Sequence, residues 1–126
     1  MTTANEQLVQ NALGQLLGDG GPAALEPLLS NDFRHHRPDG HTRSKQEWLT
    51  DVGKALIPLA GMQVEIVHLL SGGDHVVVHT RRQLPDGGPA IVVVDILRIA
   101  DGLIAEAWEI IEPVAEAAAH LHWWEL

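Results

Sequence analysis

The chain has 126 residues, and its 8 basic against 17 acidic side chains give a formal net charge of −9. This excess of acid disfavours a nucleic-acid partner, which needs clustered Lys and Arg, and it favours solubility. No cysteine is present, so disulfides, thiolate nucleophiles and cysteine-ligated metals are excluded. The length and the 45% apolar content predict one globular domain over residues 1–126.

The sequence shows no pattern for export or for insertion into a membrane. Its first residues lack a basic segment followed by an apolar one, which a signal peptide would need. No segment reaches the roughly 18 to 20 apolar residues that cross a bilayer. We therefore expect a cytoplasmic protein without a membrane partner.

Helical periodicity dominates the first half of the chain. Apolar residues repeat at helical spacing over Leu8–Leu17, and a glycine-rich segment then ends that helix. A second short helix is predicted over Ala23–Leu29. Ser44 and Glu47 have the spacing of a capping box, which predicts a third helix over Lys45–Leu59.

Strand patterns dominate the second half. The polar, turn-rich segment Phe33–Arg43 predicts a loop or a short irregular strand. Met62–Leu70 and His75–Leu84 read as a hairpin, and Ala90–Pro113 reads as two strands joined by an Asp-Gly turn. Helices gathered on one side of a four-stranded or larger antiparallel sheet make an α+β fold.

Asp95 interrupts an apolar strand, where an ionised carboxylate must pair, protonate or lie in a wet cavity. A two-residue turn would place Asp95 opposite Trp108, and Glu109 would face the other way unless a bulge re-aims it. Partial burial would raise the pKa of Asp95 toward neutrality, which suits a general acid or base. The alternative is a structural Asp that accepts hydrogen bonds from Arg98, Arg81 or a backbone group.

Two histidines are further candidates for chemistry. His79 lies inside an apolar strand, opposite Ile66 in the expected register, where a neutral imidazole could orient a carbonyl, act as a base or partner Asp95. His36 follows His35 directly, and adjacent residues of an extended segment point in opposite directions, so one of them enters a given pocket. Each histidine could equally be a structural residue.

Metal and nucleophilic chemistry have less support in the sequence. His36, His79, Asp95 and Glu109 have the residue types of metal ligands, as does the segment His120–His122, but no local metal-binding motif is present. We therefore expect no bound metal and no cofactor. A nucleophilic serine is also disfavoured, because the chain has no Gly-x-Ser-x-Gly elbow.

The expected sheet is apolar on both faces. Three helices can cover only one of them, so we expect a homodimer through the other sheet face. Residues 114–126 are rich in Ala and then in His and Trp, and they could form a last helical turn or an arm that reaches a partner.

Motifs along most of the chain resemble the SnoaL-like branch of the nuclear transport factor 2-like superfamily. Phe33–Pro38 resembles the family's aromatic, polar, His, Asn, Pro loop, and Val78-His79 resembles its Val-His strand. Val94–Arg98 resembles a Val-Asp-Ile-Phe-Arg motif, and Gly102–Glu109 resembles Gly-Lys-Ile-Val-Glu-His-Trp-Asp. The resemblance spans about residues 5–114.

The resemblance implies a cone-shaped fold with one deep pocket, usually in a homodimer. Family enzymes include polyketide cyclases that catalyse intramolecular aldol condensation, and relatives isomerise ketosteroids or hydrolyse epoxides without a cofactor. By this resemblance Asp95 would be the acid/base, His36 and His79 would orient or polarise an oxygen, and Trp108 would line the pocket.

Several positions depart from the family pattern and change the polarity of the expected pocket. His35 replaces a Gln, Ala107 replaces a His, and Glu109 replaces an Asp. His35, Glu109, Trp108 and Trp48 complete the expected ligand-binding residues, although such tryptophans are more often core or interface anchors.

Together the residues favour an acid/base enzyme that takes a proton from carbon next to a carbonyl. Asp95 would accept the proton, and His79 or His36 would stabilise the enolate oxygen. One alternative is a noncatalytic module that binds an apolar ligand in the same cavity. Another is a structural domain that only dimerises, because this fold serves many functions.

Overall fold

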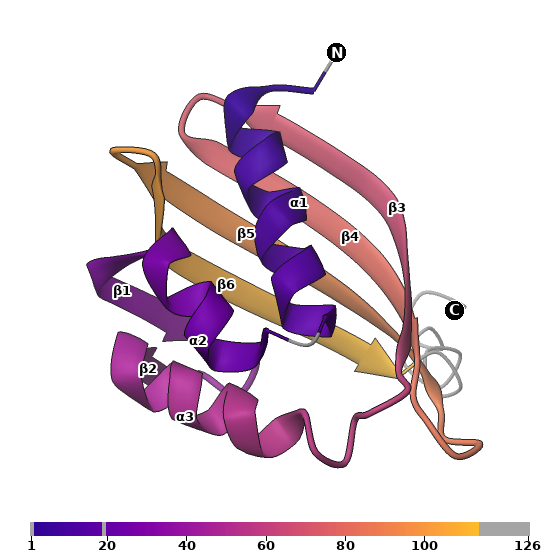
Figure 1. The fold of residues 1–126 in the computed structure, drawn as a ribbon. Coiled ribbons are helices and arrows are strands. Elements are labelled where there is room, and N and C mark those ends of the chain that lie inside the picture. The colour runs from indigo at the N-terminus through magenta and orange to yellow at the C-terminus, as the bar shows by residue number, and fades with distance from the viewer. Residues whose placement is uncertain (1, 19, 114–126) are drawn as a thin grey trace.

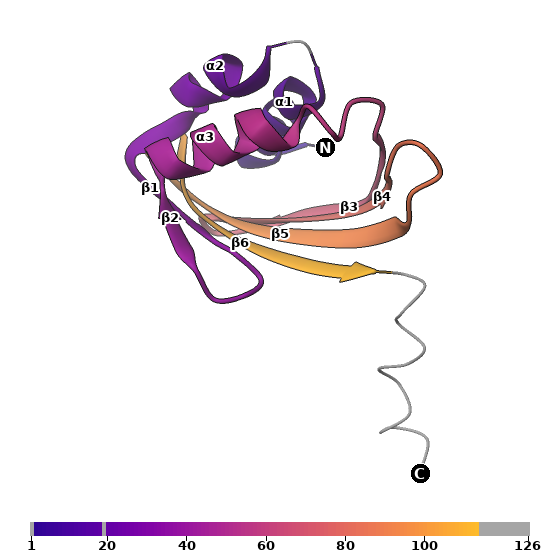
Figure 2. The ribbon, with the colours of Figure 1, turned by 90° about the horizontal axis from the view of Figure 1, so that it is seen from below.

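The computed structural model describes residues 2–18 and 20–113, and its helices all lie on one face of a curved sheet (Figures 1 and 2). The helical elements are α1 (Ala4–Leu17), α2 (Gly21–Leu25), a single 3₁₀ turn (Glu26–Leu28) and α3 (Lys45–Ala55). The strands are β1 (Leu29–His36), β2 (Thr42–Ser44), β3 (Gln63–Gly72), β4 (His75–Gln83), β5 (Ala90–Ala100) and β6 (Leu103–Pro113). The predicted arm or helical turn of residues 114–126 lies outside the described residues.

The capping box predicted for α3 is present. The Ser44 hydroxyl accepts a hydrogen bond from the Glu47 backbone N–H at 3.2 Å, and the Glu47 carboxylate accepts one from the Ser44 N–H at 2.9 Å. The helix ends at Ala55 rather than Leu59, because Pro58 lacks an N–H and disfavours helical backbone at the residue before it. The start of α3 and its capping box were therefore predicted correctly, but its end was predicted too far along the chain.

The region between α2 and β1 differs most from the prediction. The second helix stops at Leu25 because Pro27 interrupts it, and β1 begins at Leu29. The strand then runs through Phe33 to His36, where the sequence predicts either a loop or a short irregular strand. An irregularity in its pairing between Leu29 and Arg34 explains why the alternation is hard to read from the sequence.

The six strands follow the order β2-β1-β6-β5-β4-β3. All neighbours are antiparallel except β1 and β6, which pair in parallel. The α+β prediction is confirmed, with helices packed on a sheet larger than four strands. The sheet is mixed rather than purely antiparallel, because the segment before α3 supplies two strands that the meander does not include.

A bulge in β6 changes which residues share a face. Ala100 pairs with Leu103 as predicted, but the register shifts between Arg98 and Ile99, and Asp95 pairs with Glu109 instead of Trp108. The prediction that Asp95 faces Trp108 is therefore wrong. The extra residue turns Glu109 to the face of Asp95 and sends Trp108 to the other.

The register of the first hairpin also differs from the prediction. Its tight turn pairs Gly72 with His75, so a two-residue turn with Gly73 at a φ of +60° replaces the expected pairing of Ser71 with Asp74. This turn register carries on to place His79 opposite His68 rather than Ile66, and a shift between Ile66 and His68 then pairs Ile66 with Thr80.

The core fills the space between the helices and the inner face of the sheet. The buried residues of its main cluster are Val9, Leu25, Leu29, Phe33, Leu49, Val76, Val78, Ile99, Ile104 and Ala107. The outer face of the sheet carries none of the described helices (Figure 2). It exposes Leu70 by 60% and Ile110 by 53%, in agreement with the predicted second apolar face. None of the described helices is long and apolar enough to cross a membrane.

Candidate functional site

A cavity of about 100 Å³ lies between α1 and the inner face of the sheet. One wall is aliphatic and comes from α1, through Val9, Ala12, Leu13 and Leu16. The polar side chains that reach the cavity are His35, Trp48, Arg82, Asp95 and Glu109. A mostly apolar cavity with a few convergent polar groups is the usual form of a small-molecule site.

Asp95 projects from β5 into this cavity beside a buried arginine. Its carboxylate lies 3.5 Å from the Arg82 guanidinium, and the two side chains are 18% and 10% exposed. Arg82 is fixed by a 3.0 Å hydrogen bond from its Nε to the Thr80 hydroxyl, which donates to the Val93 carbonyl at 3.3 Å. Burial raises the pKa of Asp95 to about 7, although the Arg82 charge opposes this rise. The carboxyl can therefore accept and release a proton near neutral pH.

Glu109 lies directly across the hairpin from Asp95 and lines the same cavity. Burial also raises the pKa of Glu109, against the opposing charges of Arg82, Arg43 and Arg37. The Glu109 carboxylate in turn helps to raise the pKa of Asp95. Because both acids interact with Arg82, we expect them to titrate as a coupled pair rather than independently.

His35 is 3% exposed and supplies a neutral hydrogen-bond donor to the cavity. Arg43 donates a 3.0 Å hydrogen bond to its Nδ1. A guanidinium has only donors, so Nδ1 must be the acceptor and the ring proton lies on Nε2. Burial, together with the charge of Arg43, lowers the pKa of His35 to about 4, so the ring is neutral at physiological pH.

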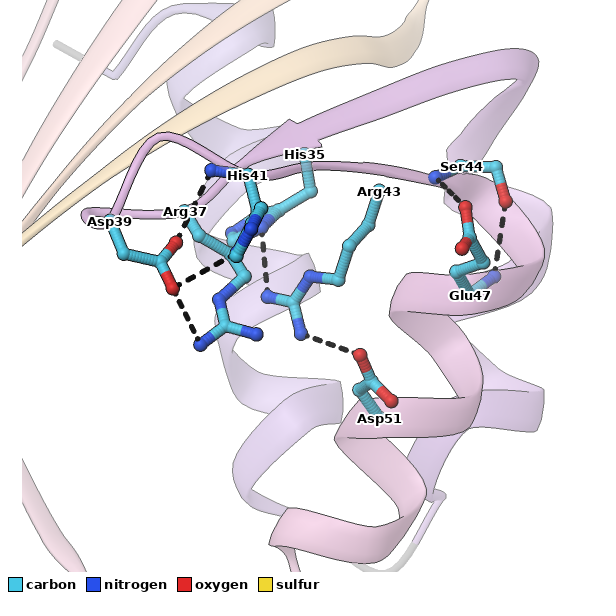
Figure 3. A network of polar contacts seen from close by, with 8 residues as sticks. All are labelled: His35, Arg37, Asp39, His41, Arg43, Ser44, Glu47 and Asp51. Atoms are coloured by element: carbon cyan, nitrogen blue, oxygen red, sulfur yellow. Dashed lines mark hydrogen bonds and ion pairs between the residues drawn. The ribbon is translucent and has the colours of Figure 1, made fainter.

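Further contacts hold His35 and Arg43 in place. The His35 ring stacks on Trp48 with centroids 5.5 Å apart. Arg43 lies between His35 and Asp51, to which it donates a 2.8 Å hydrogen bond (Figure 3). The tautomer of His35 is therefore fixed by a chain of contacts that starts on the surface of α3.

His36, His79 and Trp108 lie on the outer face of the sheet and do not line the cavity. The prediction that these three residues share one cavity with Asp95 is therefore wrong. β1 is a true strand, so His35 enters and His36 points away, where it contacts Glu106 at 2.6 Å and stacks on Trp108. His79 alternates with the inward Val78 on β4 in the same way.

The candidate metal set is likewise divided between the two faces. Asp95 and Glu109 face the cavity, whereas His36 and His79 face outward, so these four side chains cannot hold one ion. Within residues 2–18 and 20–113, no three His, Asp or Glu side chains cluster closely enough to enclose a metal.

Arg82 is the site residue that sequence reasoning missed. Arg81 and Arg98 were considered as partners of Asp95, yet Arg81 is exposed, whereas Arg82 is buried. The alternation of β4 could have identified Arg82 from the sequence. Every second residue of this strand faces inward, and these residues are Val76, Val78, Thr80 and Arg82.

Comparison with known proteins agrees with this architecture. The model of the SnoaL-like domain matches residues 9–107, so the chain belongs to the SnoaL-like domain family. No curated protein sequence matches the chain.

Solved structures share the fold at low identity. A Kribbella flavida protein proposed to be a ketosteroid isomerase has a TM-score of 0.76 at 21% identity, over 90% of this chain and 81% of its own. A SnoaL-like protein from Jannaschia sp. CCS1 with a proposed polyketide cyclase activity has a TM-score of 0.79 at 16% identity, over 95% and 91%. IdmH from Streptomyces antibioticus, also a proposed polyketide cyclase, has a TM-score of 0.75 at 18% identity, over 90% and 98%.

Proposed function

We propose that the cavity is the active site of a cofactor-independent acid/base enzyme that acts on a small carbonyl compound. The observation that carries this proposal is the combination of Asp95, whose pKa is raised to about 7, with the neutral N–H donor of His35 in one apolar cavity. A base near neutrality and a fixed donor are what proton abstraction next to a carbonyl requires.

In the proposed reaction, the Asp95 carboxylate takes a proton from the carbon next to the carbonyl. The electron pair of the broken C–H bond forms a carbon–carbon double bond, and the carbonyl π electrons move to oxygen. The Nε2–H of His35 donates a hydrogen bond to this enolate oxygen, which is the role predicted above for His79 or His36. If the enolate is conjugated with a second double bond, protonated Asp95 then returns the proton to a different carbon, which completes an isomerisation. In an aldol reaction it gives the proton to the alkoxide formed when the enolate attacks a second carbonyl.

The relatives support this reaction class without defining it. Ketosteroid isomerisation starts with proton abstraction next to a carbonyl, and aldol cyclisation needs the same enolate. The cavity of about 100 Å³ is smaller than the ~150 Å³ cavity that accepts benzene. We therefore propose a small substrate, or a larger one whose reactive end alone enters.

Hydrogen–deuterium exchange tests the function without a named substrate. In heavy water, small cyclic and acyclic ketones should lose their α-proton NMR signals faster with the protein than with buffer alone. Replacement of His35 by Phe should slow exchange by about 10²-fold, the usual cost of losing one oxyanion donor. The control is His75→Gln, which changes a histidine on the outer face. With this variant the ketone α-protons should exchange as fast as with the parent protein.

A noncatalytic binding protein is the second candidate, and the contact of Asp95 with Arg82 favours it because the carboxylate already has a partner. In that case ketones would raise the melting temperature of the protein, yet none would exchange. Exchange that is no faster than in buffer across the panel would therefore contradict the enzymatic proposal.

We also propose that a second copy of the chain covers the outer sheet face. The exposed Leu70 and Ile110 support this, together with the half-buried Val94 and Ile96 beside them. Light scattering should then give the mass of a dimer, and Ile110→Lys should give a monomer with an unchanged circular dichroism spectrum. A parent protein that is monomeric at high micromolar concentration would contradict the interface.

The location of the protein in the cytoplasm stays a prediction.

A further inference from the structure

His68 and His79 face each other across β3 and β4 on the outer side of the sheet, away from the cavity. The two residues are direct register partners. Their Nδ1 atoms lie 3.0 Å apart, and their rings have centroids 5.2 Å apart and planes inclined by 20°. The two rings therefore meet almost head-on, and each Nδ1 points toward the other in front of an edge hairpin.

We propose that this pair is a bidentate site for a divalent transition metal, with Cu(II) bound most tightly and Ni(II) next. Two nitrogens that each lie ~2.0 Å from a metal are about 2.8 to 3.0 Å apart when they occupy cis positions of a tetragonal sphere. The tetrahedral angle that Zn(II) prefers would need about 3.3 Å. The observed Nδ1 separation therefore fits the tetragonal metals, and each ring has only to turn in place so that its lone pair points at the metal instead of at the other ring.

The contact between the two rings already brings the two ligand atoms together. Imidazole nitrogens 3.0 Å apart can share only one proton, so one ring donates and the other accepts. A metal needs both Nδ1 lone pairs, so the proton of the donor ring moves to its Nε2 and both rings bind as neutral imidazoles. The separation needed for chelation is already present in the pair, whereas two unpaired histidines would first have to be brought together.

The surroundings of the pair suit a partly exposed cation. His68 is exposed, which leaves coordination positions open to water, and His79 is half-buried beside its register partner Val94. The nearest cation along β4 on this face is Arg81, which lies opposite Glu65 on β3. No further His, Asp or Glu completes a protein cage among the described residues, so we expect micromolar rather than nanomolar binding.

A bound metal would link the edge strand β3 to its neighbour β4. β3 pairs with β4 alone, so the edge hairpin has backbone partners on one side only. A metal that binds the folded pair and not the unfolded chain raises the melting temperature as its concentration rises. The site lies on the opposite face from Asp95 and does not rest on the proposed reaction. It shares the outer face with the proposed dimer contact, because Val94 is the register partner of His79, so metal binding and dimerisation would compete there.

Copper titration of the full chain tests the site. Calorimetry with CuSO₄ should show a site that His68→Gln and His79→Gln each weaken by about 10²-fold, because one histidine loses the effective concentration that its partner supplies. His75→Gln is the matched control, and it should bind as the parent does. The double variant His120→Gln, His122→Gln separates any binding by the C-terminal histidines.

Two measurements on the parent protein keep the test independent of the variants' folding. Paramagnetic Cu(II) should broaden backbone amide signals first around Leu69 and Thr80, and its electron spin resonance spectrum should show two coordinated nitrogens. Broadening centred elsewhere, or equal affinities for the parent and both pair variants, would overturn the proposal. Zn(II) binding tighter than Cu(II) at the same residues would overturn the assigned geometry.

Discussion

Replacement of Asp95 by Asn should make the protein more stable at alkaline pH while it removes the proposed activity. In the folded protein the pKa of Asp95 is raised from 3.8 to about 7 by burial. Its stabilising effect is therefore complete below about pH 4 and is lost as the pH rises toward 7, because the unfolded chain releases this proton first. With 1.36 kcal/mol for each pKa unit, the ionised group destabilises the fold by about 4 kcal/mol above pH 7.

Urea unfolding of both proteins at about pH 4 and about pH 8.5 measures this effect. Asn has no charge to bury, so the variant should gain stability over the parent by about 4 kcal/mol as the pH rises between these values. Asp101→Asn is the matched control, because Asp101 lies in an exposed turn at a φ of 52° that Asn tolerates. A variant whose stability follows the same pH dependence as the parent would show that Asp95 is ionised at neutral pH.

The same variant separates the stability argument from the functional one. Loss of a general base lowers rates by about 10²- to 10⁴-fold, so α-proton exchange should fall to near the level in buffer. In the parent, exchange should increase with pH through about 7, where Asp95 becomes ionised. If the stability gain appears while exchange persists, Asp95 is buried as described and another group is the base.

The sequence was most informative where local chemistry decides the structure. The capping box at Ser44, the turn at Asp101 and the apolar strand around Asp95 each depend on a few neighbouring residues, and each led to the observed element. The carboxylate in an apolar strand also led directly to the cavity, because its burial follows from its neighbours.

The site assignment was wrong where a single residue of register decided it. One extra residue in β6 exchanged the faces of Trp108 and Glu109, and a strand in place of a loop selected His35 over His36. Neither event has a strong local signal, because a bulge is set by the packing of the whole sheet and the parallel pairing of β1 with β6 is long-range. Arg82, by contrast, could have been found from the alternation of β4.

Replacement of Arg82 by Met should cost stability mainly at pH values where the cavity carboxyls are ionised. Arg82 opposes the pKa increases of both Asp95 and Glu109, and its side chain is 10% exposed. Met keeps much of the volume but leaves the acids without their buried cation. Removal of one partner from a buried ion pair costs about 3 to 5 kcal/mol, and we expect this loss above about pH 8. At about pH 5 Asp95 is protonated, so the loss should be much smaller.

The same variant should also move the activity profile. Without the Arg82 charge the pKa of Asp95 rises further, so the midpoint of the exchange rate should shift above its parent value of about 7. Arg81→Met is the control, because Arg81 is exposed next to it on β4 and should change neither property. A destabilisation that is equal at both pH values, with an unmoved midpoint, would mean that Arg82 acts only through packing and its hydrogen bond to Thr80. Arg82 would then have no part in setting the proton affinity of Asp95.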